Sequence, residues 1–162
     1  MINTLDNLFD RFFYLLELLL INASRAQLVR EMIRPALATG EIVVCDRFYD
    51  STTAYQAYGR NLDPHWVETI IDYAVGDTRP NLTFFLHLPI ALSEERRRLR
   101  QAAGAAQRDR MEEADRSFFE RVEQGYHAIA AAEPNRVKWI DATQKIETIH
   151  RQIWQEVQRL GT

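Results

Sequence analysis

A dense group of polar side chains begins at Asp46, directly after the apolar run Glu41–Cys45. Such a short β-branched run is typical of a strand buried on both faces of a sheet. In α/β sheets, ligands bind beyond the carboxyl ends of the strands, which is where Asp46 and Arg47 fall. The arginine offers a planar fork to a phosphate, and the aspartate can hold that arginine or a magnesium ion through water. We therefore expect a functional site here; the structural alternative is an Asp-Arg pair that only caps the next element.

Further hydrogen-bonding groups lie in the segment that follows. The hydroxyls of Ser51, Thr52 and Thr53 and the amide of Gln56 suit directional contacts to a base, and Tyr55 suits the wall of a sugar pocket. So many polar groups at the end of a strand have few purely structural uses. The segment therefore favours ligand binding over a structural role.

The elements that must position these groups alternate along the chain. Strands are expected at Glu41–Cys45, Leu82–Leu88 and Val137–Ile140. Helices are expected over Leu5–Leu37, Pro64–Val75, Leu92–Ala103, Ala114–Ala132 and Ile146–Leu160. This alternation predicts an α/β fold in which helices flank a parallel sheet in three layers. Because no domain boundary is visible, residues 1–162 are expected to form a single domain.

The first helical segment is either one long helix or two stacked ones, since apolar residues recur at helical spacing from Leu5 to Leu37. Pro35 should bend or end it, although the pattern resumes up to Gly40, which suits a C-terminal cap. The apolar run Leu15–Ile21 is interrupted by Glu17 and is far shorter than the roughly 20 residues needed to cross a bilayer. We expect no membrane association.

Composition argues against several classes of protein. The 162 residues carry a net charge of −3, so no overall positive charge draws the chain to nucleic acid. The single cysteine, Cys45, rules out an internal disulfide and a multi-cysteine zinc site. Its apolar neighbours predict a buried thiol, in keeping with a reducing cytoplasm.

Five ordered motifs resemble the thymidylate kinase family. The run from Asp46 to Arg60 contains that family's Asp-Arg-aromatic triplet and its Ala-Tyr-Gln-x-x-Gly-Arg segment. The other motifs lie within Glu17–Val29, Pro80–Leu88, Asp109–Tyr126 and Asp141–Gln144, and the match runs from about Glu17 to Leu160. The resemblance implies a nucleoside-monophosphate kinase fold of the P-loop type, transfer of a phosphoryl group from ATP to dTMP for dTTP synthesis, and a homodimer formed through packed helices.

Carried over to this sequence, the resemblance implies a site for dTMP. Arg47 would grip the phosphate, Asp46 would lie near the magnesium-bridged phosphates, and Tyr55 would crowd the sugar so that deoxyribose is preferred. The remaining residues expected to bind substrate are Arg25, which would hydrogen-bond the thymine, and Ser51, Thr52, Gln56 and Arg60.

The resemblance also implies an ATP side with a lid over residues 96–112. Arg96 and Arg100 open the lid helix, and in the bacterial type of the family a lid arginine supplies charge to the transferring phosphoryl group. The residues expected on the ATP side are Arg97, Arg108, Arg110, Asp141 and Thr143. The structural alternative for the arginines is a solvated helix face paired with Glu94 and Glu95.

The sequence departs from the family at the phosphate cradle. The motif G-x-x-x-x-G-K-[ST] does not occur, because no two of the 6 glycines stand at its spacing. Residues 1–14 find no counterpart, and Ile21 stands where the family usually has a phenylalanine that stacks on thymine. We expect a thymidylate kinase without its first strand and phosphate-binding loop, inactive or nearly so alone. The alternatives are a non-catalytic nucleotide-binding or dimerisation remnant and a deoxynucleoside kinase, a group that lacks the Ala-Tyr-Gln-x-x-Gly-Arg segment.

Overall fold

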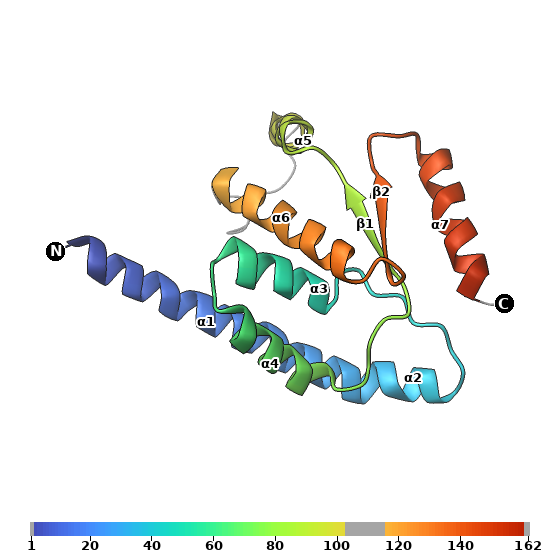
Figure 1. Ribbon diagram of the computed structural model, residues 1–162, viewed down its shortest axis with the longest axis horizontal. Helices are drawn as coiled ribbons and strands as arrows, with labels where there is room; N and C mark the ends of the chain where they lie inside the picture. The colour runs from blue at the N-terminus through green and yellow to red at the C-terminus, as the bar shows by residue number, and fades with distance from the viewer. Residues whose placement is uncertain (1, 103–115, 161–162) are drawn as a thin grey trace. The chain divides into compact units, whose positions relative to one another are not determined.

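The computed structural model of the chain describes residues 2–102 and 116–160. These residues form two compact units, which we describe separately. The first unit comprises the described residues up to Arg79 together with Arg121–Tyr126, and the second comprises the other described residues. Figure 1 follows the chain through its elements.

A continuous run of helix opens the first unit. It consists of α1 (Ile2–Leu28), the π-helix η1 (Val29–Ile33) and α2 (Arg34–Ala38). The helix does not end at Pro35, which lies at the start of α2. The wider turn of η1 comes directly before it, so the helix changes geometry next to the proline instead of breaking there.

Gly40 ends this helical run, as its sequence position predicts. Its φ of 81° lies in the left-handed region that favours glycine. The Glu41 N–H donates to the Ala36 carbonyl at 3.0 Å and the Gly40 N–H donates to the Leu37 carbonyl at 3.0 Å. Together these bonds form a Schellman motif, which satisfies carbonyls at the helix end.

The core of the first unit lies between α1 and α4 (Pro64–Val75). Helix α4 has the predicted bounds, since Asp63 caps it by accepting a bond from the His65 N–H at 2.9 Å and Pro64 stands in its first turn. In the sequence, α3 (Tyr49–Thr52) and the π-helix η2 (Thr53–Gly59) come before α4, and both contact it. The buried apolar residues of this core are Leu18, Val29, Ile33, Tyr49, Ala57, Val67, Ile71, Ala74 and Val75.

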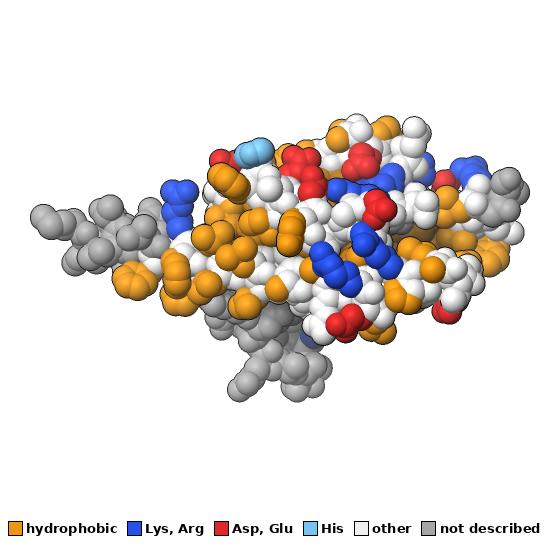
Figure 2. All heavy atoms as spheres, turned by 90° about the horizontal axis from the view of Figure 1, so that it is seen from below, with side chains coloured by type: hydrophobic (Ala, Val, Ile, Leu, Met, Phe, Trp, Pro, Cys, Tyr) orange, Lys and Arg blue, Asp and Glu red, His pale blue; other side chains and the backbone are white. Residues whose placement is uncertain are grey.

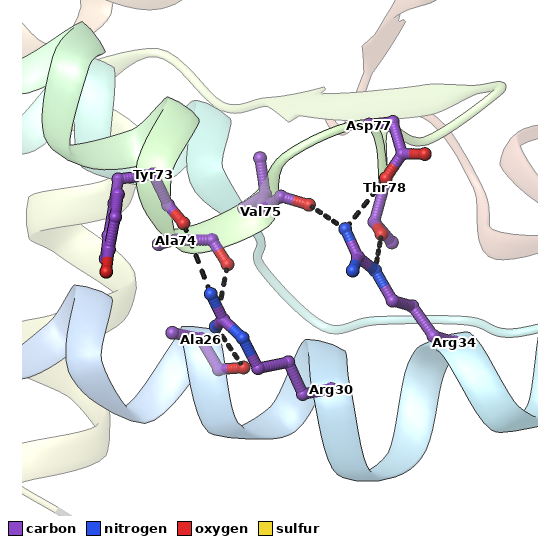
Figure 3. Close-up of polar contacts among 8 residues, drawn as sticks. All are labelled: Ala26, Arg30, Arg34, Tyr73, Ala74, Val75, Asp77 and Thr78. Atoms are coloured by element: carbon purple, nitrogen blue, oxygen red, sulfur yellow. Dashed lines mark hydrogen bonds and ion pairs between the residues drawn. The ribbon is translucent and has the colours of Figure 1, made fainter.

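Two arginines bind the C-terminal end of α4 (Figure 3). Arg30 donates to the Tyr73 and Ala74 carbonyls at 3.5 Å each. Arg34 donates to the Val75 carbonyl at 3.3 Å, to Thr78 Oγ1 at 2.9 Å and to Asp77 Oδ1 at 2.7 Å. Cations at a helix C-terminus meet carbonyls that have no partner within the helix, so these hydrogen bonds fix the end of α4 against η1 and α2.

The expected strand Glu41–Cys45 is wrong for this structure. The segment has no regular secondary structure, and Ile42 and Val44 are 91% and 89% exposed. Cys45, expected to be buried, is also exposed. A β-branched run becomes a strand only when a neighbouring strand completes its hydrogen bonds, and in residues 2–102 and 116–160 no strand pairs with it.

The second unit contains the parallel strands β1 (Thr83–His87) and β2 (Val137–Asp141). They lie side by side with Thr83 opposite Val137 and His87 opposite Asp141 (Figure 1). The helices of this part of the chain are α5 (Ile90–Ala102), α6 (Arg116–Ala132), whose middle belongs to the first unit, and α7 (Ile146–Leu160). Helices between parallel strands confirm the predicted α/β class.

Helix α1 carries a second apolar face opposite the buried one. The exposed side chains that recur along it at helical spacing are Phe9, Phe12, Phe13, Leu16, Leu19 and Leu20. Figure 2 shows hydrophobic side chains gathered on one face of the molecule. Within the described residues, Phe9–Ala38 is long and apolar enough to cross a membrane, a property that helices of water-soluble proteins also show.

Candidate functional site

Arg47 has an uncommon backbone conformation. Its φ is 68°, in the left-handed region that residues other than glycine seldom adopt. The guanidinium carbon lies 4.4 Å from the centroid of the Tyr55 ring, and Nε donates to Ser51 Oγ at 3.2 Å. A cation over an aromatic face is an attractive contact. Two side-chain contacts thus fix a strained residue, a combination that is concentrated at ligand sites.

The outer end of the Arg47 side chain is open. Arg47 is exposed, and within the described residues neither Nη1 nor Nη2 makes a hydrogen bond or an ion pair. A guanidinium presents these two nitrogens as a planar fork that matches two oxygens of a phosphate. The structure therefore holds the inner part of Arg47 and leaves free the part that can bind an anion.

Tyr126, from the middle of α6, joins the same group. Its hydroxyl lies 3.1 Å from Ser51 Oγ, and its ring meets the Tyr55 ring edge-on with 6.4 Å between centroids. Burial raises the pKa of the Tyr126 phenol above its ordinary value, and the hydrogen bond with Ser51 opposes that rise. The phenol is therefore neutral at pH 7. We call Arg47, Ser51, Tyr55 and Tyr126 the Arg47 cluster.

Arg25 is tethered within the same unit. Its Nη1 donates to Asn22 Oδ1 at 2.7 Å, while Asn22 is buried and donates to the Leu18 carbonyl at 2.8 Å. Arg25 Nη2 reaches the Phe48 carbonyl at 3.5 Å, and the guanidinium lies 5.6 Å from the Phe48 ring centroid. Burial lowers the pKa of Arg25 to about 10, against the opposing effect of Asp50, so the side chain is still charged at neutral pH.

Gln56 and Arg60 both contact Glu17. Gln56 is 1% exposed and its amide donates to Glu17 Oε1 at 2.7 Å. Arg60 lies 3.9 Å from Glu17 Oε2 and stacks on Tyr14, with 4.5 Å to the ring centroid. Thr52 is likewise buried. These three expected substrate ligands thus lie inside the first unit in this conformation.

Asp46 is an exposed carboxylate beside Arg47. Both residues line a groove of about 350 Å³ between the helix around Met32 and the segment from Val43 onward. Within the described residues, no group of three or more His, Cys, Asp or Glu could hold a metal ion by itself. Magnesium in nucleotide sites takes one or two carboxylates and completes its shell with phosphates and water, so a single Asp46 fits that ion.

In the second unit, the residues expected on the ATP side differ in how far their contacts hold them. Arg96 and Arg100 are exposed on α5, while Arg97 lies 5.7 Å from the Phe119 ring centroid. Asp141 accepts bonds from the Thr143 N–H at 2.9 Å and the Thr143 hydroxyl at 2.7 Å, and these bonds hold the pKa of that carboxyl below its usual value. Arg108 and Arg110 lie outside the described residues.

Tyr126, Asn22 and Glu17 were not expected from the sequence to have a role in the site. Gly125-Tyr126 and Glu17-Leu18 do stand in the stretches that resemble the family, so a signal was present. Nothing in the sequence indicates that Tyr126 meets Ser51, since the two are 75 positions apart. The role of these residues is visible only in three dimensions.

Comparison with known proteins agrees with the motifs. The thymidylate kinase family model matches residues 5–153, a range that includes part of the segment for which we found no counterpart. The chain is 43% identical over 144 residues to the thymidylate kinase of Alcanivorax borkumensis and 45% identical over 145 residues to that of Deinococcus radiodurans. These alignments span 89% and 90% of this chain but 67% and 68% of the relatives.

A solved structure supports the same assignment. The crystal structure of thymidylate kinase from Ehrlichia chaffeensis superposes with a TM-score of 0.68 at 29% identity, over 90% of this chain and 65% of that one. The chain therefore spans about two thirds of the length of the proteins it matches. On the family model, the curated relatives and the shared fold together, the chain belongs to the thymidylate kinase family.

Proposed function

We propose that this chain binds dTMP at the Arg47 cluster and, together with a phosphate cradle for ATP, transfers a phosphoryl group to it. One observation carries the proposal: Arg47 is fixed by Tyr55 and Ser51, while within the described residues its two terminal nitrogens make no hydrogen bond or ion pair. An arginine prepared in this way binds a phosphate without first losing much side-chain freedom. The thymidylate kinases it resembles supply the identity of the nucleotide.

Phosphoryl transfer between nucleotides asks the protein for positioning and positive charge and for little covalent work. Arg47 supplies both to the acceptor phosphate, since its position is set before the ligand arrives. Magnesium, when bound with ATP, neutralises phosphate charge, and Asp46 would hold it through water. Arg25, charged and tied to Asn22, is suited to a carbonyl oxygen of the base. Base contacts by Thr52 and Gln56 stay predictions, because both are buried here.

The 162 residues contain no G-x-x-x-x-G-K-[ST] motif. Its backbone N–H groups and lysine hold the β- and γ-phosphates, and neither Lys138 nor Lys145 follows a glycine. We infer that these residues alone bind dTMP without efficient turnover. The second candidate function is nucleotide binding without catalysis, for which we also expect the chain to bind dTMP. Because a single unpaired cysteine suits a reducing compartment, we propose that the protein is cytoplasmic.

Calorimetric titration of the chain with nucleoside monophosphates tests the binding proposal. We expect dTMP to bind more tightly than dCMP, whose amino group replaces the oxygen that Arg25 is suited to contact. Thymidine, which has the base but no phosphate, should bind more weakly than dTMP. Equal affinity for dTMP and dCMP would contradict recognition of thymine, and equal affinity for dTMP and thymidine would contradict the phosphate site.

We further propose that a second copy of the chain covers the exposed face of α1. The apolar residues of this helix form two stripes, and one of them packs on α4. The other stripe is exposed: Phe9 is 63% exposed and Leu20 is 68% exposed. A two-fold dimer places the same face of each copy against the other, so one apolar stripe suffices to build the interface. Phe12→Glu with Leu19→Glu should convert a dimer to a monomer in sedimentation measurements. A wild-type monomer that floats with lipid vesicles would instead indicate a membrane surface.

A further inference from the structure

The strongest feature without an assigned role is Tyr126. It contributes a hydroxyl that is largely removed from water and that meets Ser51 Oγ at 3.1 Å. Its ring also supports the edge of Tyr55, the residue under the Arg47 guanidinium. Tyr126 therefore contacts Ser51 and Tyr55, the two residues that in turn contact Arg47.

The number of hydrogens at Ser51 bears on which hydroxyl donates in the Ser51–Tyr126 hydrogen bond. A serine hydroxyl has one hydrogen to donate and two lone pairs to accept. Arg47 Nε occupies one lone pair at 3.2 Å. Tyr126 carries its proton at neutral pH, and burial raises the pKa of the phenol further. If Tyr126 donates, both lone pairs of Ser51 are filled and the serine hydrogen is left for a third partner.

We propose that Tyr126 is a positioning residue: it donates to Ser51 so that the Ser51 hydroxyl, together with the Arg47 fork, donates to a phosphate oxygen of the bound nucleotide. This inference rests on the proposed function. A phosphate beside Arg47 favours this arrangement of hydrogens, because the Ser51 hydrogen then points at negative charge. Tyr126 itself touches neither the phosphate nor the reacting atoms.

The first test is a double-mutant cycle measured by calorimetry with dTMP and with thymidine. Tyr126→Phe keeps the ring and removes the hydroxyl, so dTMP should bind about three- to tenfold more weakly, while thymidine affinity stays the same. Ser51→Ala should give a similar loss, and the double variant should be no weaker than the weaker single variant. Tyr73→Phe, an exposed tyrosine on α4, is the control that should change nothing. Additive losses, or equal losses for dTMP and thymidine, would overturn the proposal.

The second test needs no nucleotide, so it separates this inference from the proposed function. In NMR spectra, the Arg47 Nε–H signal is assigned by its loss in Arg47→Lys. Tyr126→Phe should speed the exchange of that hydrogen with water several-fold, since Ser51 loses its fixed orientation, whereas Tyr73→Phe should not. Unchanged exchange would overturn the positioning role even if dTMP binds. Faster exchange in a chain that does not discriminate dTMP from thymidine would overturn the dTMP site alone.

Discussion

The two units differ in how firmly they hold the residues expected to meet phosphate. In the first unit, Arg47 is fixed by a ring and a hydroxyl before any ligand is present. In the second unit, Arg96 and Arg100 stand exposed on α5. The first arrangement is typical of a binding site prepared in advance, and the second is typical of groups that become ordered around a ligand.

This contrast suggests a division of work in phosphoryl transfer. A monophosphate must be recognised among similar nucleotides, which rewards fixed donors and a shaped surface. The arginines of a lid act only once both substrates are in place, so they need not be fixed beforehand. We therefore expect changes in the first unit to alter binding and stability, and changes on α5 to alter turnover.

The largest expected effect concerns catalysis. The 162-residue chain should show negligible dTMP kinase activity in a coupled ADP-release assay, because no residue replaces the cradle and lysine of the absent motif. Loss of one preorganised donor from such a site lowers the rate by about 10²–10³, and here the whole set is absent. A family N-terminus grafted ahead of Glu17 should restore activity. Turnover by the ungrafted chain on the order of 1–100 s⁻¹ would contradict this expectation.

A stability experiment tests whether the first unit depends on tight packing. In Gly125→Ala, the added methyl group would lie 2.9 Å from ring atoms of Tyr58 and 3.0 Å from the Ala54 Cα. Because Ala54 offers backbone, the structure must shift, and we expect a loss of about 1–3 kcal/mol in the free energy of unfolding. Gln124→Ala, at an exposed neighbour on the same helix, is the control. Equal midpoints for both variants in urea would show that this contact is not tight.

A smaller effect is expected for sugar selectivity. If Tyr55 occupies the volume that a 2′-hydroxyl needs, dUMP should bind more tightly than UMP, by about 1 kcal/mol or fivefold. Tyr55→Leu should reduce this preference and also weaken binding of both nucleotides, because Arg47 loses the ring beneath it. Competition calorimetry measures both effects. Equal affinities in the wild type would remove Tyr55 from the sugar site.

The smallest expected change in dTMP affinity concerns the arginines of the second unit, and it tests the contrast between the two units. Arg96→Ala and Arg100→Ala remove exposed side chains of the second unit, so dTMP affinity should stay within about 0.5 kcal/mol of the wild type. In the grafted enzyme, at least one of the two variants should lower kcat. A large loss of dTMP affinity in either variant would place these arginines in the acceptor site.

Much of the fold follows from local signals in the sequence. Helix α4 has its predicted bounds because Asp63 and Pro64 start it and Gly76, with a φ of 58°, ends it. Helix α7 and both strands of the second unit also lie where periodicity places them, to within two residues. The segment Glu41–Cys45 does not form the strand that its apolar residues predict. An apolar run becomes a strand only beside a neighbouring strand, and the run itself does not specify that neighbour.

The site shows the same limit. Arg47, Ser51 and Tyr55 lie in contact, as residues within a few positions of one another can, and their binding of substrate stays a prediction. Gln56 and Arg60 belong to the same stretch, but their side chains contact Glu17. The π-helix η2 changes which residues share a face, and the sequence gives no sign of it. Tyr126 requires a contact between distant segments, which only the structure reveals.

The measurement that tests the account most directly is the affinity of Arg47 variants for dTMP and thymidine. Loss of a charge-assisted bond to phosphate should cost about 2 kcal/mol, so Arg47→Ala should bind dTMP about thirtyfold more weakly and thymidine as well as the wild type does. Arg47→Lys should recover part of that loss, because it keeps the charge but not the fork. Unchanged dTMP affinity in Arg47→Ala would contradict the assignment of the phosphate site to the Arg47 cluster.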